Sequence, residues 1–260
     1  MMAPIKVAVY GALGKVGREV VKAIASDSAT IIVSAIDIKA VGDHLILPEY
    51  NINVPLSSNI EEIIDITHPE VIVDFTVAKA AMPLIRIATK RKINIVSGTT
   101  GFTQEDLNEV ERLAGEYRVG VMIAPNFAIG AVLMMHLAKI SAKYFDYAEI
   151  VELHHHLKAD APSGTSIATA RGMVQSRGKP FQLPSGQTSE EQIDGITIHS
   201  VRLPGLMAHQ EVLFGASGQT LTIRHDTISR ECYMPGVLLA VKEIIKRQGL
   251  IFGLDTLLGL

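Results

Sequence analysis

Hydrophobic positions in the first half of the chain form short continuous runs, separated by longer stretches in which apolar and polar residues recur with helical spacing. Five runs are rich in β-branched residues and almost entirely apolar, as in buried parallel strands. They cover residues 5–10, 31–36, 71–75, 94–97 and 120–123. The helical stretches cover residues 16–25, 59–66, 78–91 and 103–117. This repeated βαβ order predicts an α/β fold with a Rossmann-like, doubly wound parallel sheet.

The pattern changes after Pro125, where we expect a second domain to begin. Its predicted elements are a helix at 128–143, a strand at 147–153, a loop and helix at 157–177, and strands at 196–201, 210–214 and 220–225. Pro235 opens a last predicted helix, 236–246, with Gly249 just past its end. Residues 38–55 show little periodicity, and residues 184–195 form a polar segment.

Composition narrows the functional classes. The net charge of −3 gives no reason to expect nucleic acid or an acidic membrane surface as a partner. The single cysteine, Cys232, fits a reducing compartment. The N-terminus shows no export signal, and the most apolar segments, 128–138 and 250–260, are too short or interrupted to span a bilayer. We therefore expect a soluble, cytoplasmic protein.

The first predicted strand runs into a glycine loop that opens a helix: Gly11, Ala12, Leu13, Gly14, Lys15, Val16 and Gly17. Such glycines let a backbone approach a pyrophosphate, and the helix N-terminus offers N–H groups to the anion. Asp37 ends the second strand, 20 residues after Gly17, where a carboxylate suits the adenosine ribose of a dinucleotide. Asp37 would repel a ribose 2′-phosphate and Lys39 would attract one, so NADH and NADPH both remain open.

Two further loops follow predicted strands, on the edge of the sheet where doubly wound folds bind ligands. Gly98, Thr99 and Thr100 follow the fourth strand. Ala124, Pro125, Asn126 and Phe127 follow the fifth. Both loops are candidates for contact with the nicotinamide half of the coenzyme. The alternative for each is an ordinary strand-to-helix connection.

A second concentration of chemistry is the run His154, His155, His156, Leu157 and Lys158. This cationic group can hold carboxylates, and histidine can supply a proton near neutral pH. Ser163 follows as a helix cap, which leaves the N–H groups of Gly164 and Thr165 available to a carboxylate. A metal site is disfavoured by the nearby lysine and the lack of cysteine ligands, and we predict none. A solvated polar loop is the other alternative.

Taken together, these segments resemble the 4-hydroxy-tetrahydrodipicolinate reductase (dihydrodipicolinate reductase) family. The similarity covers nearly the whole chain and is most specific in the block from Glu152 to Thr165. The other matching segments are residues 11–17, 74–76, 98–102, 124–127, 218–226 and 236–237. Lys15 stands where the family often has arginine, which blurs coenzyme preference, and we assign His156 no role.

The resemblance implies a function and its residues. It implies NAD(P)H-dependent reduction of a cyclic dicarboxylate on the diaminopimelate route to lysine. His154 would be the catalytic acid or base, Lys158 a second proton donor, and His155, Gly164 and Thr165 would bind substrate. Residues 11–16, Asp37, 98–100 and 124–127 would hold the coenzyme. It further implies a dinucleotide-binding domain, 1–126 completed by 236–260, and a substrate-binding domain, 127–235, whose sheet builds a homotetramer.

Two other hypotheses stay open on the sequence. One is a different two-domain oxidoreductase, such as a sugar or amino-acid dehydrogenase, that shares only the N-terminal half. The other is a redox sensor that binds coenzyme without turnover and would tolerate the loss of Lys158.

Overall fold

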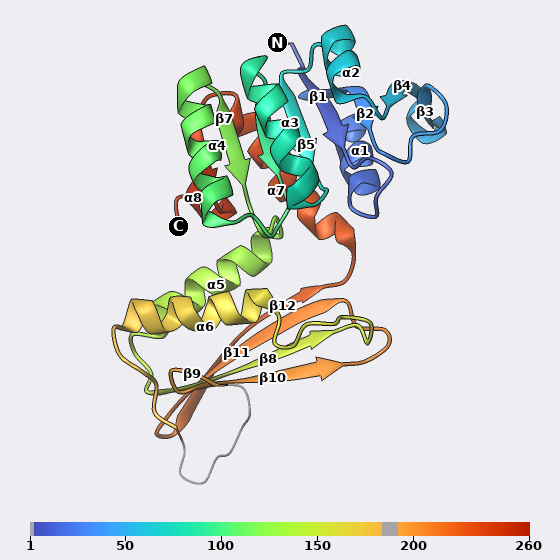
Figure 1. Ribbon diagram of the computed structural model, residues 1–260. Coiled ribbons are helices and arrows are strands. Elements are labelled where there is room, and N and C mark those ends of the chain that lie inside the picture. Colours follow the sequence, from blue (N-terminus) through green and yellow to red (C-terminus); the bar gives the residue numbers. More distant parts are fainter. Residues whose placement is uncertain (1–2, 184–191) are drawn as a thin grey trace. The chain divides into compact units, whose positions relative to one another are not determined.

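The computed structural model describes residues 3–183 and 192–260, which divide into two compact units. One unit comprises the described residues up to Phe127 together with Tyr233–Leu260, and the other is Ala128–Cys232. Figure 1 shows a sheet and its own helices in each. The polar segment noted at 184–195 lies outside the described residues except for its last four positions.

The first unit is built on an eight-stranded sheet in the order β13-β7-β6-β5-β1-β2-β4-β3. Its strands are β1 (Ile5–Tyr10), β2 (Thr30–Ile36), β3 (His44–Leu47), β4 (Ile52–Ser57), β5 (Val71–Asp74), β6 (Asn94–Ser97), β7 (Gly120–Ile123) and β13 (Gly249–Phe252). All neighbours pair in parallel except β3 and β4. The five apolar runs thus form the strands that the sequence predicts, and the doubly wound sheet is confirmed.

Helices cover both faces of this sheet, with α2, α3 and α4 on one face and α1 and α7 on the other (Figure 1). Their bounds are α1 (Gly17–Ser26), α2 (Ile60–Thr67), α3 (Ala78–Lys90), α4 (Gln104–Tyr117), α7 (Met234–Ile244) and α8 (Leu254–Leu258). Thr103 caps α4 through the reciprocal bonds with Asp106 that its spacing predicts. Buried aliphatic side chains such as Ile72, Leu84 and Ile95 fill the space between sheet and helices.

Two parts of this unit differ from the sequence-based expectation. Residues 38–55, which show little periodicity, contain the hairpin of β3 and β4 with a short 3-10 turn, Pro48–Tyr50, between them. Gly249 does not merely end the last helix; it begins β13, which pairs in parallel with β7. The apolar tail therefore extends the sheet by an edge strand, because its backbone groups find partners on β7.

The second unit packs two helices on a five-stranded sheet in the order β12-β11-β8-β10-β9. Its strands are β8 (Tyr147–His154), β9 (Gln192–Ile193), β10 (Ile196–Arg202), β11 (Ala208–Ala216) and β12 (Gln219–Thr227). Helices α5 (Ile129–Ser141) and α6 (Gly164–Arg177) lie on one face (Figure 1). The core between them includes Ile150, Met173 and Phe214. Among the described residues of this unit, no helix covers the opposite face.

Candidate active site

The glycine loop joins β1 to α1 at the carboxyl edge of the first sheet. Gly11 has a φ of 80°, and a Cβ added there would lie 2.7 Å from the carbonyl oxygen of Phe75. A Cβ added at Gly17 would lie only 2.0 Å from the carbonyl oxygen of Gly11. The segment after β5 leaves no room for a side chain at Gly11, and the loop itself leaves none at Gly17, so both positions require glycine.

This loop presents hydrogen-bond donors at the N-terminus of α1. The N–H of Gly14 donates to the Gly11 carbonyl. Within the described part of the chain, the N–H groups of Lys15, Val16 and Gly17 have no hydrogen-bond acceptor. Unpaired N–H groups at the start of a helix are the arrangement that binds a pyrophosphate, so the loop fits a dinucleotide.

Asp37 is tied to the same loop. Its Oδ2 accepts a hydrogen bond of 2.9 Å from the N–H of Leu13, and its Oδ1 accepts one of 2.9 Å from the N–H of Lys39. The side chain is almost fully buried. Each oxygen keeps a second lone pair that a ribose hydroxyl can use. Asp37 thus holds the loop through its hydrogen bond with Leu13, and it lies at the position where the sequence predicts the ribose contact.

The two other predicted coenzyme loops meet around Phe75. The aromatic ring of Phe75 packs against Gly98, where an added Cβ would lie 2.2 Å from the ring edge, and lies 5.7 Å from the ring of Phe127 between centroids. The Oγ1 of Thr99 accepts a hydrogen bond from the N–H of Thr76. Thr100, Ala124, Pro125 and Asn126 belong to these same two loops. The structure therefore brings all the predicted coenzyme segments together on one edge of the sheet.

Asp74, to which the sequence reasoning assigned no role, holds these loops in place. Its buried carboxylate accepts hydrogen bonds of 2.6 Å from the Thr76 hydroxyl and 2.7 Å from the Ser97 hydroxyl. Burial raises the pKa of Asp74, and these donors only partly offset that effect. The available signal was a lone acid at the end of an otherwise apolar strand.

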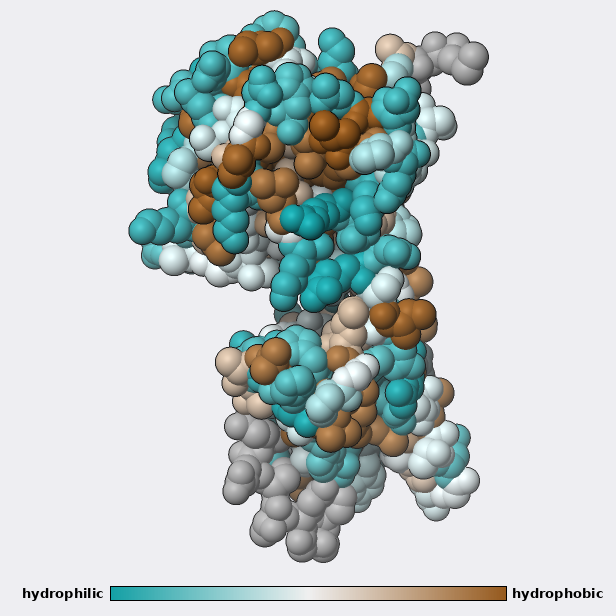
Figure 2. All heavy atoms as spheres, turned by 90° about the vertical axis from the view of Figure 1, so that its right-hand side faces the viewer, coloured by the Kyte–Doolittle hydropathy of each residue, from teal (hydrophilic) through white to brown (hydrophobic). Residues whose placement is uncertain are grey.

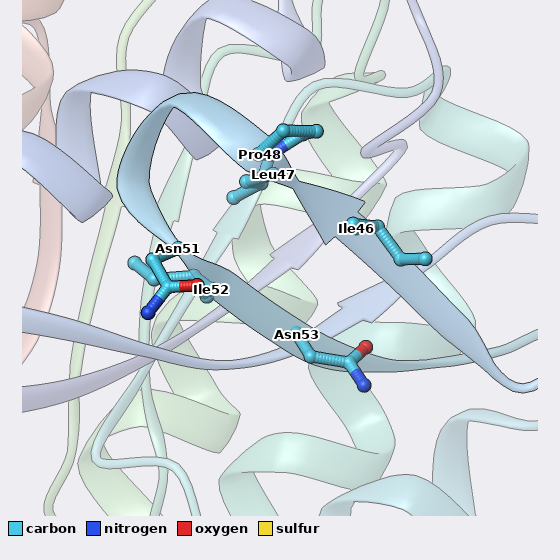
Figure 3. Close-up of a pocket in the computed structure, with 6 residues that line it drawn as sticks. All are labelled: Ile46, Leu47, Pro48, Asn51, Ile52 and Asn53. Atoms are coloured by element: carbon cyan, nitrogen blue, oxygen red, sulfur yellow. The ribbon is translucent and has the colours of Figure 1, made fainter.

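A separate shallow pocket lies on the β3–β4 hairpin (Figure 3). It is lined by Ile46, Leu47, Pro48, Asn51, Ile52 and Asn53. None of the predicted site residues contributes to it. Its lining carries no charged side chain and no nucleophile, so it offers none of the chemistry that the other two clusters offer.

In the second unit, His154 ends β8 and is backed by a buried carboxylate. Nδ1 of His154 is hydrogen-bonded to Oε2 of Glu152, whose side chain is fully buried. Arg202 donates to the same carboxylate from both terminal nitrogens, 2.7 Å to Oε1 and 2.9 Å to Oε2 of Glu152. Burial by itself would raise the pKa of Glu152, but hydrogen bonds from His154 and Arg202 outweigh it and lower that pKa to about 2. The carboxylate is therefore charged at neutral pH.

Lys158 lies on the turn that follows β8. The N–H of Lys158 donates to the carbonyl of His155, and its ammonium contacts both carboxylate oxygens of Asp160, at 2.7 and 2.8 Å. This ammonium lowers the pKa of Asp160. His155 is half-buried and His156 exposed on the same turn. The cationic groups predicted to hold a carboxylate are thus gathered on one short turn.

The N-terminus of α6 is the third part of this cluster. Ser163 caps the helix by accepting from the N–H of Ser166, so Gly164 and Thr165 are its first two residues. Gln210 on β11 anchors this helix: its side chain bonds the Ser166 hydroxyl at 2.9 Å and the Thr169 hydroxyl at 2.8 Å. Gln210 stands directly opposite Glu152 in the β11–β8 pairing, so the anchor of α6 adjoins the support of His154.

Neither a metal-binding cluster nor a membrane-spanning helix is found among the described residues. Across residues 3–183 and 192–260, no three His, Cys, Asp or Glu side chains are placed to hold a metal ion. In those same ranges, no helix combines the length and apolarity needed to cross a membrane. Figure 2 shows hydrophilic and hydrophobic residues interspersed on the viewed face of both units.

Known proteins resemble this chain along its whole length. Residues 5–127 match the family described as dihydrodipicolinate reductase, N-terminus, and residues 130–258 match dihydrodipicolinate reductase, C-terminus. A 4-hydroxy-tetrahydrodipicolinate reductase of Dehalococcoides mccartyi is 51% identical over the full length of both chains. One of Syntrophomonas wolfei is 46% identical, over 97% of this chain and 98% of its own.

A solved structure agrees with these relatives. The dipicolinate-bound dihydrodipicolinate reductase of Paenisporosarcina sp. TG-14 is 38% identical and superposes with a TM-score of 0.87, over 98% of this chain and 99% of its own. The match extends through the second unit and is not confined to the N-terminal half. It therefore removes the hypothesis of a sugar or amino-acid dehydrogenase that shares only the first domain.

Proposed function

The chain belongs to the dihydrodipicolinate reductase family, and we propose that His154, Lys158 and the N-terminus of α6 carry out that family's reaction here. The reaction is the NAD(P)H-dependent reduction of 4-hydroxy-tetrahydrodipicolinate to tetrahydrodipicolinate, a step of lysine and diaminopimelate biosynthesis. The observation that carries our assignment is the backing of His154 by a buried, ionised glutamate, beside a lysine and a capped helix start.

The coenzyme is held, in this proposal, by the glycine loop and its two neighbours. Gly11, Ala12, Leu13, Gly14, Lys15 and Val16 bind the pyrophosphate, and Asp37 binds the adenosine ribose. The residues Gly98, Thr99, Thr100, Ala124, Pro125, Asn126 and Phe127 hold the nicotinamide half. The substrate's hydroxyl must leave as water, which makes the ring a conjugated imine, and the reduced nicotinamide would then supply a hydride to that imine.

The substrate's two carboxylates need fixed donors. The N–H groups of Gly164 and Thr165 start α6, where the helix dipole favours an anion, and they bind one carboxylate. His155 and the ammonium of Lys158 face the same anionic substrate. Without substrate, the ammonium of Lys158 pairs with the carboxylate of Asp160. In this proposal a substrate carboxylate replaces Asp160 as the partner of Lys158.

Hydride addition leaves electron density on the substrate, and one proton must be delivered. Nε2 of His154 delivers it, since Nδ1 is bonded to Glu152. Lys158 would stabilise the charge that develops on the ring nitrogen, and it is the second group that can donate this same proton. Positioned acid catalysis of this kind is worth about 10²- to 10⁴-fold in rate.

The decisive experiment generates the unstable substrate in place from pyruvate and aspartate semialdehyde with the synthase that joins them. Oxidation of NADH and of NADPH is then followed by absorbance, which also establishes coenzyme preference. We expect synthase-dependent oxidation, and a fall in kcat of at least about 100-fold in Lys158→Ala, with coenzyme binding retained. Lys179→Ala is the matched control, because Lys179 is an exposed lysine near another aspartate of the same unit.

The two alternatives predict different results. If Lys158→Ala turns over like the parent, Lys158 is not a proton donor and its assignment is wrong. If the parent binds coenzyme and the synthase product but oxidises neither coenzyme, the sensor hypothesis replaces the reductase.

We also propose a homotetramer that assembles through the open face of the second sheet. Val151, Leu153 and Leu213 alternate with the buried positions of β8 and β11, so their side chains lie on the face opposite α5 and α6, where they are only half-buried. Apolar residues on an uncovered sheet face suit an interface between copies.

A nicotinamide enzyme of amino-acid biosynthesis with one unpaired cysteine fits the cytoplasm, where we place it.

A further inference from the structure

Glu152 is a fully buried carboxylate directly behind the proposed proton donor. It lies on the helix-covered face of β8, opposite Ser200 on β10 and Gln210 on β11. Burying a charge is costly unless partners compensate it, and here His154 and the two terminal nitrogens of Arg202 do so. An acid in this position therefore needs a reason beyond packing, since apolar side chains would fill the same space at lower cost.

The contact determines which nitrogen of His154 faces the substrate. A carboxylate accepts hydrogen bonds and does not donate them, so Nδ1 of His154 carries the proton that Glu152 accepts. In the neutral ring, Nε2 is then the bare nitrogen, and in the cation it carries the proton that leaves. With Nδ1–H held by Glu152, the histidine cation donates its proton from Nε2. The neutral ring that remains accepts the next proton at the same nitrogen.

Arg202 joins both halves of the proposed catalytic group. It stands opposite His154 in the parallel pairing of β10 and β8. One of its terminal nitrogens also donates 2.8 Å to the carbonyl of Asp160, whose carboxylate holds the ammonium of Lys158. A single guanidinium thus contacts the support of His154 and the turn that carries Lys158.

We propose that Glu152 and Arg202 are positioning residues: Glu152 orients His154 and selects its tautomer, and Arg202 holds Glu152 and the Lys158 turn in register. This inference rests on the proposed role of His154 as the proton donor. It goes further by assigning a function to two side chains that are not among the proposed proton donors, substrate-binding residues or coenzyme-binding residues.

The test is a double-mutant cycle on kcat with Glu152→Gln and His154→Ala, measured with substrate generated in place. If Glu152 acts through His154, Glu152→Gln lowers kcat about 10- to 100-fold in the parent. In the His154→Ala background the same change alters kcat by less than about 3-fold, because the group that it orients is gone. Binding of dipicolinate, a stable cyclic dicarboxylate, should change little in Glu152→Gln.

Arg202→Lys is the second variant, since it keeps the charge and loses the planar fork. We expect it to lower kcat in the parent and to spare dipicolinate binding. Glu109→Gln is the matched control: Glu109 also accepts two hydrogen bonds from one arginine, Arg86, but on the exposed surface between α3 and α4. This control should leave kcat and KM unchanged.

A spectroscopic measurement keeps the proposal testable even for a poorly folding variant. In the parent labelled with ¹⁵N-histidine, the neutral ring of His154 should show a protonated Nδ1 and a bare Nε2. The opposite tautomer in the parent overturns the proposal. So does an equal loss of kcat from Glu152→Gln in both backgrounds, which indicates a general structural role. If His154→Ala alone leaves kcat unchanged, the assignment of His154 itself fails, which is a separate result.

Discussion

The close approach between Gly17 and Gly11 can be tested by adding one methyl group. In Gly17→Ala the new Cβ would begin 2.0 Å from the Gly11 carbonyl oxygen, whereas ordinary contact starts near 3.4 Å. The loop or the first turn of α1 must therefore move by about 1.4 Å. The neighbouring atoms are backbone, so no side-chain rotation relieves the contact.

A shift of this size takes loop N–H groups out of hydrogen-bond range of a bound pyrophosphate, because such bonds are 2.7 to 3.2 Å long and weaken steeply beyond. Each hydrogen bond to a charged group is worth about 1.5–3 kcal/mol. Losing one weakens coenzyme binding by roughly 10- to 100-fold. Titration with NADH and NADPH, followed by nicotinamide fluorescence, measures the change directly.

The matched control is Gly115→Ala, in the last turn of α4, where an added Cβ meets no atom within 4 Å. That variant should bind coenzyme like the parent and unfold at no lower a temperature, since alanine favours a helix over glycine by up to about 1 kcal/mol. Circular dichroism and thermal unfolding show whether Gly17→Ala keeps its fold. A folded Gly17→Ala that binds both coenzymes within about 2-fold of the parent would refute the reasoning.

Two further predictions concern the second unit. The pKa of Glu152 is lowered in the folded chain to about 2, so its stabilising contribution is complete above its ordinary pKa of 4.5 and is lost as pH falls toward 2. Denaturant unfolding between pH 6 and 3 should show the parent losing about 2 kcal/mol more stability than Glu152→Gln, and parallel curves would contradict this. Light scattering should give a tetramer for the parent and smaller species for Val151→Lys, because burying a lysine at the interface removes water from its ammonium group. A monomeric parent would remove the assembly proposal.

The elements that the sequence predicted well are those whose signal is local. Apolar runs at residues 5–10, 94–97 and 120–123 become strands with the same ends, because a strand buried on both faces must be apolar throughout. The reciprocal cap at Thr103 and the cap at Ser163 follow from side chains that reach backbone groups only three residues away. The glycine loop is also predictable from local sequence, because its glycines lie close together between an apolar strand and a helix.

The missed elements depend on distant partners. β13 is a four-residue edge strand whose hydrogen bonds come from β7, about 130 residues earlier, so its own sequence resembles any apolar tail. The hairpin is equally hard to predict, because β3 alternates exposed and half-buried positions over four residues and β4 buries only Val54 and Leu56. In both cases pairing, rather than local preference, forms the strand.

The same division applies to the candidate site. Sequence alone indicated which side chains are candidates for the chemistry, since a histidine run, a lysine and a helix cap lie within a dozen residues of one another. Only the tertiary structure revealed Arg202 and Gln210, which are brought to Glu152 by the registers of β10 and β11 with β8. Those registers depend on contacts between residues about 50 positions apart. The order of residues along the chain therefore does not predict which partner a buried charge will contact.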